Sequence, residues 1–131
     1  MMTKKEHINY WIQSSEEDWE TVISLLHSGR YVHCLFFAHL ALEKLSKAIW
    51  IKFKEGNIPP KIHNIVKLLL ETNQVFKEDD LTFLEEFNDF QLEGRYPDYL
   101  FEINKRCTKE YTNTILNRVE LIKKCLLEKL Q

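Results

Sequence analysis

The sequence predicts an all-α protein, because helical patterns run through it and turn-forming residues are scarce. Apolar residues recur at helical spacing along most of the 131 residues, which include only 3 Gly and 3 Pro. A β-sheet needs frequent turns, whereas long helices joined by a few loops do not. Hydrophobic residues make up 44% and charged residues 29% of the chain, as in globular domains. We expect a single domain over residues 1–131.

The first helix is predicted from about Lys5 to His27. Its apolar stripe consists of Ile8, Trp11, Ile12, Ser15, Trp19, Val22, Ile23 and Leu26. Ser14 and Ser15 precede Glu17 and Asp18 and offer an alternative helix start. The stripe continues in phase across them, so one long helix is the better interpretation. Gly29 should follow its end, since glycine suits the left-handed position after a helix.

The second helix, predicted over about Arg30–Lys54, is apolar on nearly all sides in its first half. One stripe consists of Tyr31, Cys34, Leu35, Ala38, Leu42, Leu45, Ile49 and Phe53, and the other faces carry Val32, Phe36, Phe37, Leu40 and Ala41. A helix of this kind lies either at the centre of a bundle or in an interface. Charged residues make its second half amphipathic.

Three further helices are predicted after Pro59-Pro60, a pair that cannot lie inside a helix. A short helix spans about Lys61–Glu71. The next begins near Glu78, where acids favour a helix N-terminus, and runs to Leu92. Residues from Arg95 to about Ile103 are expected to form an aromatic loop, and the last helix to span about Asn104–Leu130.

The charge is nearly balanced overall but uneven along the chain. A formal net charge of −2 argues against a protein that coats nucleic acid nonspecifically. Between Glu43 and Lys67, six Lys and two Glu give a local balance of +4, and between Phe76 and Glu93, one Lys and seven acids give −6. These segments are either an anion-binding and a partner-binding surface, or two ordinary solvated helix faces.

The sequence indicates neither a membrane segment nor a metal site. Met1–Tyr10 lacks the apolar run of a signal peptide, and no apolar stretch is long enough to span a bilayer. We therefore expect a cytoplasmic protein with no membrane partner. The three cysteines form no C-x-x-C pair, and His33 and His39 are spaced off a common helix face. We expect no metal and no cofactor, and interpret the cysteines as small core residues.

Three stretches carry motifs in a particular order. The first is Gly29-Arg30-Tyr31, followed by Ala38–Ala48 with its Glu-Lys-x-x-Lys-Ala; the second is Pro59–Ile65 with its Pro-x-x-His; the third is Gly94–Tyr99 with its Arg-Tyr-Pro-Asp. Together with Trp11 and the layout of the first helix, they resemble the HEPN family over nearly the whole chain.

The resemblance implies an up-and-down bundle of four or five helices, usually a symmetric homodimer. Many members of the family act with a separately encoded minimal nucleotidyltransferase in a toxin–antitoxin-like pair. Others are ribonucleases, which use an Arg and a His with four to six residues between them, paired across the dimer.

This sequence departs from the ribonuclease pattern. Counted from Arg95, the positions expected to hold the His carry Leu100, Phe101 and Glu102, and no His follows His63. RNA cleavage without a metal needs groups that accept and return a proton, which His does near neutral pH. Arg95 can only clamp a phosphate, so the sequence favours a non-enzymatic protein.

The residues of the third motif have two interpretations each. Arg95 is either a phosphate clamp or a structural ion-pair partner of Asp98 or Glu43. Tyr96 and Tyr99 either stack on a base or pack the loop onto the bundle, and packing is the preferred interpretation. Asp98 either joins a binding site or caps the Pro turn through nearby backbone N–H groups.

The second group of candidates lies on or after the second helix. Glu43 and Lys47 have the spacing of a helical ion pair. Lys44 lies beside the apolar stripe, so it either reaches solvent or meets an anion at the edge of a cleft. His63 is either a base or nucleotide contact, or a structural residue in the first turn of the short helix, and His39 is interpreted as a satisfied core residue.

These observations leave three hypotheses. The first is a homodimeric subunit that binds a nucleotide or RNA phosphate and pairs with a minimal nucleotidyltransferase. Its site would consist of Arg95, Lys44, Lys47, His63, Tyr96, Asp98 and Glu43. The second is a divergent ribonuclease toxin in which His63 or Tyr99 replaces the missing His. The third is a purely structural helical dimerisation partner.

Overall fold

A computed structural model describes residues 1–91 and 97–131, with the backbone alone described for residues 97–100. The regular elements of these residues are all helical, which confirms the all-α class. They are α1 (Lys4–His27), α2 (Tyr31–Phe53), α3 (Ile65–Leu70), α4 (Glu78–Phe87), the 3₁₀ turn η1 (Asn88–Phe90), α5 (Pro97–Arg106) and α6 (Lys109–Lys129).

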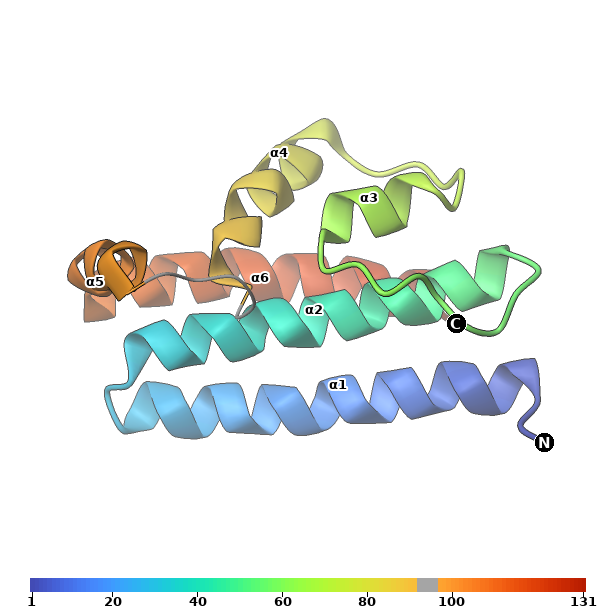
Figure 1. Ribbon diagram of the computed structural model, residues 1–131, viewed down its shortest axis with the longest axis horizontal. Coiled ribbons are helices and arrows are strands. Elements are labelled where there is room, and N and C mark those ends of the chain that lie inside the picture. The colour runs from blue at the N-terminus through green and yellow to red at the C-terminus, as the bar shows by residue number, and fades with distance from the viewer. Residues whose placement is uncertain (92–96) are drawn as a thin grey trace.

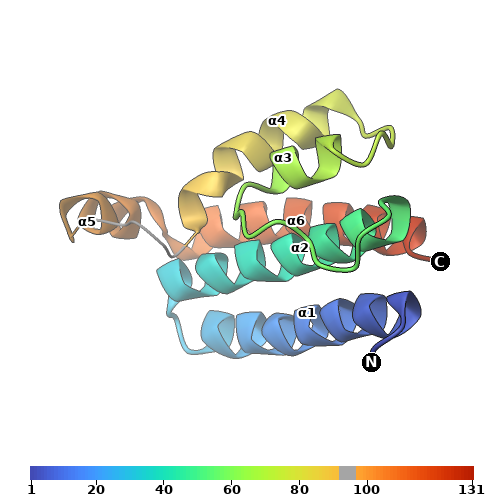
Figure 2. The same cartoon turned by 45° about the vertical axis from the view of Figure 1, so that its right-hand side comes forward.

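Three long helices, α1, α2 and α6, lie side by side with α2 in the middle (Figure 1). α1 runs antiparallel to α2, and α6 runs parallel to α2. α3 and α4 cover the side of α2 that faces away from α1, and α5 lies beyond the end at which α1 turns into α2 (Figure 2). The central position of α2 explains why its first half is apolar on nearly all sides.

The ends of α1 are fixed by local hydrogen bonds. At its start, Thr3 and Glu6 form a capping box, in which the Thr3 hydroxyl accepts from the Glu6 N–H at 3.1 Å. At its end, Gly29 has a φ of +76°, and the Arg30 N–H donates to the Leu25 carbonyl at 2.9 Å. This is a Schellman motif, and it confirms the predicted role of glycine. α1 is also continuous across Ser14-Ser15, as predicted.

The short third helix begins later than predicted. Asn64 is its N-cap residue, and the Asn64 side chain accepts from the Lys67 N–H at 3.1 Å. His63 therefore precedes the helix, and its predicted place in the first turn is wrong. α4 also ends earlier than predicted, at Phe87, because the chain tightens into η1 before residue 91.

The predicted aromatic loop between Arg95 and Ile103 is wrong from Pro97 onward. Proline lacks a backbone N–H, which the first helical position does not need, so Pro97 begins α5 rather than excluding a helix. The predicted single helix Asn104–Leu130 is wrong at its start as well. Thr108 has an extended backbone, with φ −78° and ψ 170°, and its side chain accepts from the Tyr111 N–H, so α6 starts anew.

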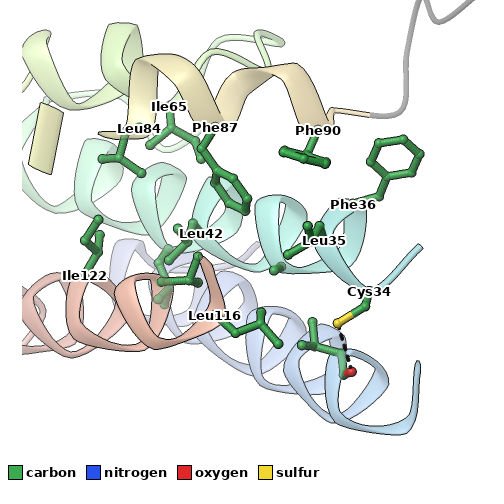
Figure 3. Packing of buried hydrophobic residues seen from close by; sticks show 14 of the residues in the cluster. Cys34, Leu35, Phe36, Leu42, Ile65, Leu84, Phe87, Phe90, Leu116 and Ile122 are labelled. Carbon is green, nitrogen blue, oxygen red and sulfur yellow. Dashed lines mark hydrogen bonds between the residues drawn. The ribbon is translucent and has the colours of Figure 1, made fainter. Parts of the chain in front are cut away.

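The core lies between α2, the α4–η1 segment and α6 (Figure 3). Phe36, Phe87 and Phe90 form a chain of ring contacts, with centroids 6.1 Å and 5.5 Å apart. Cys34 and Cys107 are buried as predicted, whereas Cys125 is half-buried. Burial raises the pKa of the Cys34 thiol to about 11, so this side chain behaves as a small apolar residue.

Two lysines tie the bundle together at helix C-termini. Lys4 Nζ donates to the Lys54 and Gly56 carbonyls at 2.9 and 3.1 Å, at the end of α2. Lys52 Nζ donates to the Lys129 carbonyl at 2.6 Å, at the end of α6. A positive charge there also suits the helix dipole. Within the described parts of the chain, every helix is too short or too polar to cross a membrane.

Candidate functional site

The Glu43 cluster, defined as Glu43, Lys47 and His63, is built around one buried carboxylate. Glu43 is 3% exposed and lies on α2. Its Oε2 accepts from Lys47 Nζ at 3.0 Å, and its two oxygens lie 3.2 and 3.1 Å from His63 Nδ1. The cluster confirms the predicted Glu43–Lys47 pair and adds His63 from the segment before α3.

The cluster orients its imidazole. A carboxylate only accepts hydrogen bonds, so His63 Nδ1 carries a proton and donates it to Glu43. The Glu43 side chain is 4% exposed, whereas the His63 side chain is 35% exposed. The buried Glu43 carboxylate thus fixes the orientation of a His63 imidazole that solvent can reach. When doubly protonated, such an imidazole can donate its Nε2–H to a phosphate oxygen, and when neutral its Nε2 can accept a proton.

Lys47 is held by an aromatic ring as well as by Glu43. Its Nζ lies 5.3 Å from the centroid of the Trp11 ring on α1, a distance typical of cation–π contact. The Lys47 side chain is 11% exposed. One ammonium group, one imidazole and one carboxylate therefore meet where α1, α2 and the segment before α3 come together.

A second polar network lies next to the cluster and joins α2 to α3 and η1. Asn88 Oδ1 lies 3.0 Å from His39 Nε2 and accepts from the Ile65 N–H at 3.3 Å. Asn88 Nδ2 donates to Asn64 Oδ1 at 3.0 Å. His39 is 1% exposed and its Nδ1 lies 3.9 Å from Glu43 Oε1. His39 is thus a satisfied core histidine, as predicted.

Lys44 contacts a different part of the molecule. Its Nζ forms an ion pair with Asp18 Oδ2 at 2.8 Å and donates to Ser14 Oγ at 2.7 Å, both on α1. The expectation that Lys44 either reaches solvent or meets an external anion is therefore corrected, because the anion belongs to its own chain. Neither of these contacts is with a residue of the Glu43 cluster.

The remaining candidate site residues lie in or next to the segment that the structure does not describe in full. Arg95 and Tyr96 lie outside the described residues, as do the side chains of Asp98 and Tyr99, whose backbone belongs to α5. Phosphate clamping, base stacking and the turn-capping role of Asp98 therefore stay predictions.

Sequence reasoning missed Asn88 and Asn64 as parts of the site. A signal for Asn88 was present, because it is a polar residue at a position that continues the apolar stripe of α4. No comparable signal pointed to Asn64. In the part of the chain that the structure describes, no three His, Cys, Asp or Glu side chains are grouped so that they could hold a metal ion.

Comparisons with known proteins address the fold and the family. The crystal structure of TT1696 from Thermus thermophilus resembles this fold with a TM-score of 0.77 and 20% sequence identity, covering 94% of this chain and 98% of that chain. No curated protein matches the chain. The family model of the HEPN domain matches residues 8–130, nearly the whole sequence. The chain therefore belongs to the HEPN domain family.

Proposed function

We propose that this HEPN-domain protein binds a nucleotide or nucleic-acid phosphate and acts with a separately encoded minimal nucleotidyltransferase, as one half of a toxin–antitoxin-like pair. The observation that carries the proposal is that one buried carboxylate holds both an ammonium group and a solvent-reachable imidazole. With His63 protonated, the formal charges of Lys47, His63 and Glu43 sum to +1. Phosphate oxygens accept strong hydrogen bonds from such donors.

Each residue has a stated role in the proposed site. His63 contacts the phosphate, Lys47 supplies positive charge, and Glu43 orients both. Arg95, Tyr96 and Asp98 belong to the proposed site because of their Arg-Tyr-Pro-Asp motif alone. Lys44 is not counted among the phosphate contacts, because its ammonium group is paired with Asp18.

The binding site is tested by titrating the protein with AMP, ATP and a 5′-phosphorylated single-stranded RNA. Loss of the His63 contact in His63→Ala should weaken binding about tenfold, since a hydrogen bond to a charged group is worth about 1.5 kcal/mol or more. His33→Ala is the matched control, because His33 is exposed and lies on the same helix as Glu43. Equal binding by both variants, or none by the unaltered protein, would contradict the site.

The partner is tested separately, by affinity purification of the tagged protein from its native host followed by mass spectrometry. We expect a small nucleotidyltransferase to be recovered with it. Analytical ultracentrifugation addresses the proposed homodimer. Recovery of the protein alone contradicts the pairing, and a monomer at micromolar concentration contradicts the dimer.

A divergent ribonuclease is the second candidate function, and the geometry of His63 favours it. An imidazole backed by a buried carboxylate has the arrangement of an acid–base catalyst. Induced expression should then arrest growth, and both His63→Ala and Arg95→Ala should relieve the arrest. Normal growth in the presence of folded protein, with no cleavage of RNA in vitro, would remove this candidate.

A further inference from the structure

A pocket of about 220 Å³ lies between the α4–η1 segment and the start of α6. Its walls combine aromatic rings with carboxylates. They include Phe83, Phe87, Phe90 and Tyr111, together with Glu86 and Asp89. No residue of the Glu43 cluster lines it, so this pocket is separate from the proposed phosphate site.

Part of this pocket already holds a guanidinium group from the chain itself. The Arg106 guanidinium carbon lies 5.5 Å from the Phe90 ring centroid and 5.8 Å from that of Tyr111. Its Nη2 lies 4.0 Å from Asp89 Oδ2, and both side chains are about half exposed. A pair this long and this exposed is weak. The aromatic and acidic walls of the pocket therefore bind a planar cation, and they bind this one only weakly.

The pocket has a net negative charge, which favours binding of a second cation. Glu86 and Asp89 carry two negative charges against the single positive charge of Arg106, a net of −1. Glu86 is exposed and forms no ion pair with any other residue in the described parts of the chain. The described segment Phe76–Gln91, which supplies one wall of the pocket, has one Lys and six acids, a balance of −5. This field attracts a basic partner and repels the phosphates of a nucleic acid.

We propose that this pocket is a docking site for an arginine side chain of a basic protein segment. The guanidinium stacks on the partly exposed rings of Phe83 and Tyr111 and donates to Glu86, beside Arg106 or in its place. A drug-sized ligand requires a pocket of roughly 300 Å³ or more, so the available volume suits a single side chain. The proposal stands independently of phosphate binding at the Glu43 cluster.

The test is an NMR titration with the peptide acetyl-Ala-Ala-Arg-Ala-Ala-amide. The same peptide with citrulline, the neutral isostere of arginine, serves as the ligand control. We expect only the arginine peptide to shift the resonances of Phe83 and Tyr111. Equal shifts with citrulline, or shifts of the same resonances with a single-stranded oligouridine, would overturn the proposal.

Three variants are expected to affect peptide binding in different ways. Glu86→Gln should weaken peptide binding about threefold, the size expected of one exposed ion pair. Arg106→Ala should strengthen it about threefold, because the internal competitor is removed. Glu85→Gln, which removes the same charge from the next position outside the pocket, should leave binding unchanged. Weaker binding by Arg106→Ala, or equal effects at positions 85 and 86, would contradict an arginine site here.

Discussion

Glu43 is a buried charge that is satisfied from two directions, by Lys47 in its own helix and by His63 from another segment. A carboxylate in a buried position is stable only if such donors surround it. Removing it would leave the Lys47 ammonium, 11% exposed, without an anion. We therefore expect the loss of Glu43 to lower the stability of the fold, whatever its effect on function.

We expect Glu43→Ala to lower the free energy of unfolding by about 3 kcal/mol, because it breaks a buried ion pair and leaves one charge uncompensated. Urea unfolding followed by circular dichroism measures this change. Glu102→Gln is the control, since the Glu102–Lys105 pair is 3.8 Å long and its side chains are 73% and 61% exposed. That variant should change stability by less than about 0.5 kcal/mol. Equal effects would contradict the buried role of Glu43.

Cys34 should resist alkylation in the folded protein. Its pKa of about 11 leaves roughly one thiolate in a thousand at pH 8, and only the thiolate reacts. Cys125 is half-buried and should be modified first. Iodoacetamide labelling followed by peptide mass spectrometry measures the order, and labelling in urea supplies the unfolded reference. Equal rates at both cysteines in the native state would contradict this prediction.

Sequence reasoning reached the Glu43–Lys47 pair because four-residue spacing in a helix fixes which side chains are neighbours. It did not reach the pairing of Glu43 with His63 or of His39 with Asn88. These partners are 20 and 49 residues apart in the chain, and their meeting depends on how α3 and η1 pack on α2.

The helix boundaries are set by single capping side chains. Thr3, Asn64 and Thr108 each accept a hydrogen bond from the backbone of the helix that follows. Thr108 separates α5 from α6 and thereby decides where the final long helix begins. Without a cap, the first N–H groups of α6 would lack a partner within the protein.

We expect Thr108→Ala to destabilise the protein by about 1 kcal/mol, the usual value of an N-cap side chain. Thr114→Ala is its matched control on the same helix, because Thr114 is exposed and its hydroxyl donates to the Glu110 carbonyl. Alanine favours an exposed helix interior, so that variant should be neutral or slightly stabilising. Thermal unfolding of both variants measures the difference, and equal losses would contradict the capping role.

At the level of single helices, apolar periodicity predicted the bounds of α1 and α2 to within a few residues and failed around α5. Periodicity gives the length of a helix, whereas caps give its ends. The Pro97 segment was predicted as a loop because proline and aromatic residues are frequent in loops. Proline is also well suited to the first position of a helix, and the sequence alone did not distinguish the two.

The whole molecule is organised around α2, which α1, α6 and the α3–α4 layer cover on different sides. Fifteen residues of α2 are buried, against two of α1. An element enclosed in this way opens only when the rest of the fold opens. α3 has six residues and lies at the surface of the bundle.

Native-state hydrogen exchange should therefore be slowest in the middle of α2, around Leu42–Ile49, and faster in α3. The amides of α2 are expected to exchange through global unfolding, so their rates should follow the stability changes of Glu43→Ala and Thr108→Ala. The amides of α3 should be less sensitive to these changes. Exchange of α2 as fast as that of α3 would show that the bundle does not open as one unit.

The fold class was predicted correctly from composition and periodicity, and the motifs around Glu43, His63 and Arg95 led to the correct family. The Arg106 pocket was not predicted. It consists of residues from α4, η1, α5 and α6, and their meeting follows from tertiary packing rather than from any local pattern.

The backbone of Gly29, in the turn between α1 and α2, has a conformation that suits an amino acid of D chirality. Gly29 has a φ of +76°, and a Cβ added there would meet no atom within 4 Å. An L-alanine would be strained by about 1 kcal/mol in this backbone, whereas a positive φ is the favoured conformation of its mirror image. Chemically synthesised protein with D-alanine at position 29 should thus melt at a higher temperature than the natural chain, because the unfolded state loses freedom worth about 0.5 kcal/mol. One residue of opposite chirality would then strengthen a bundle made otherwise of L-amino acids.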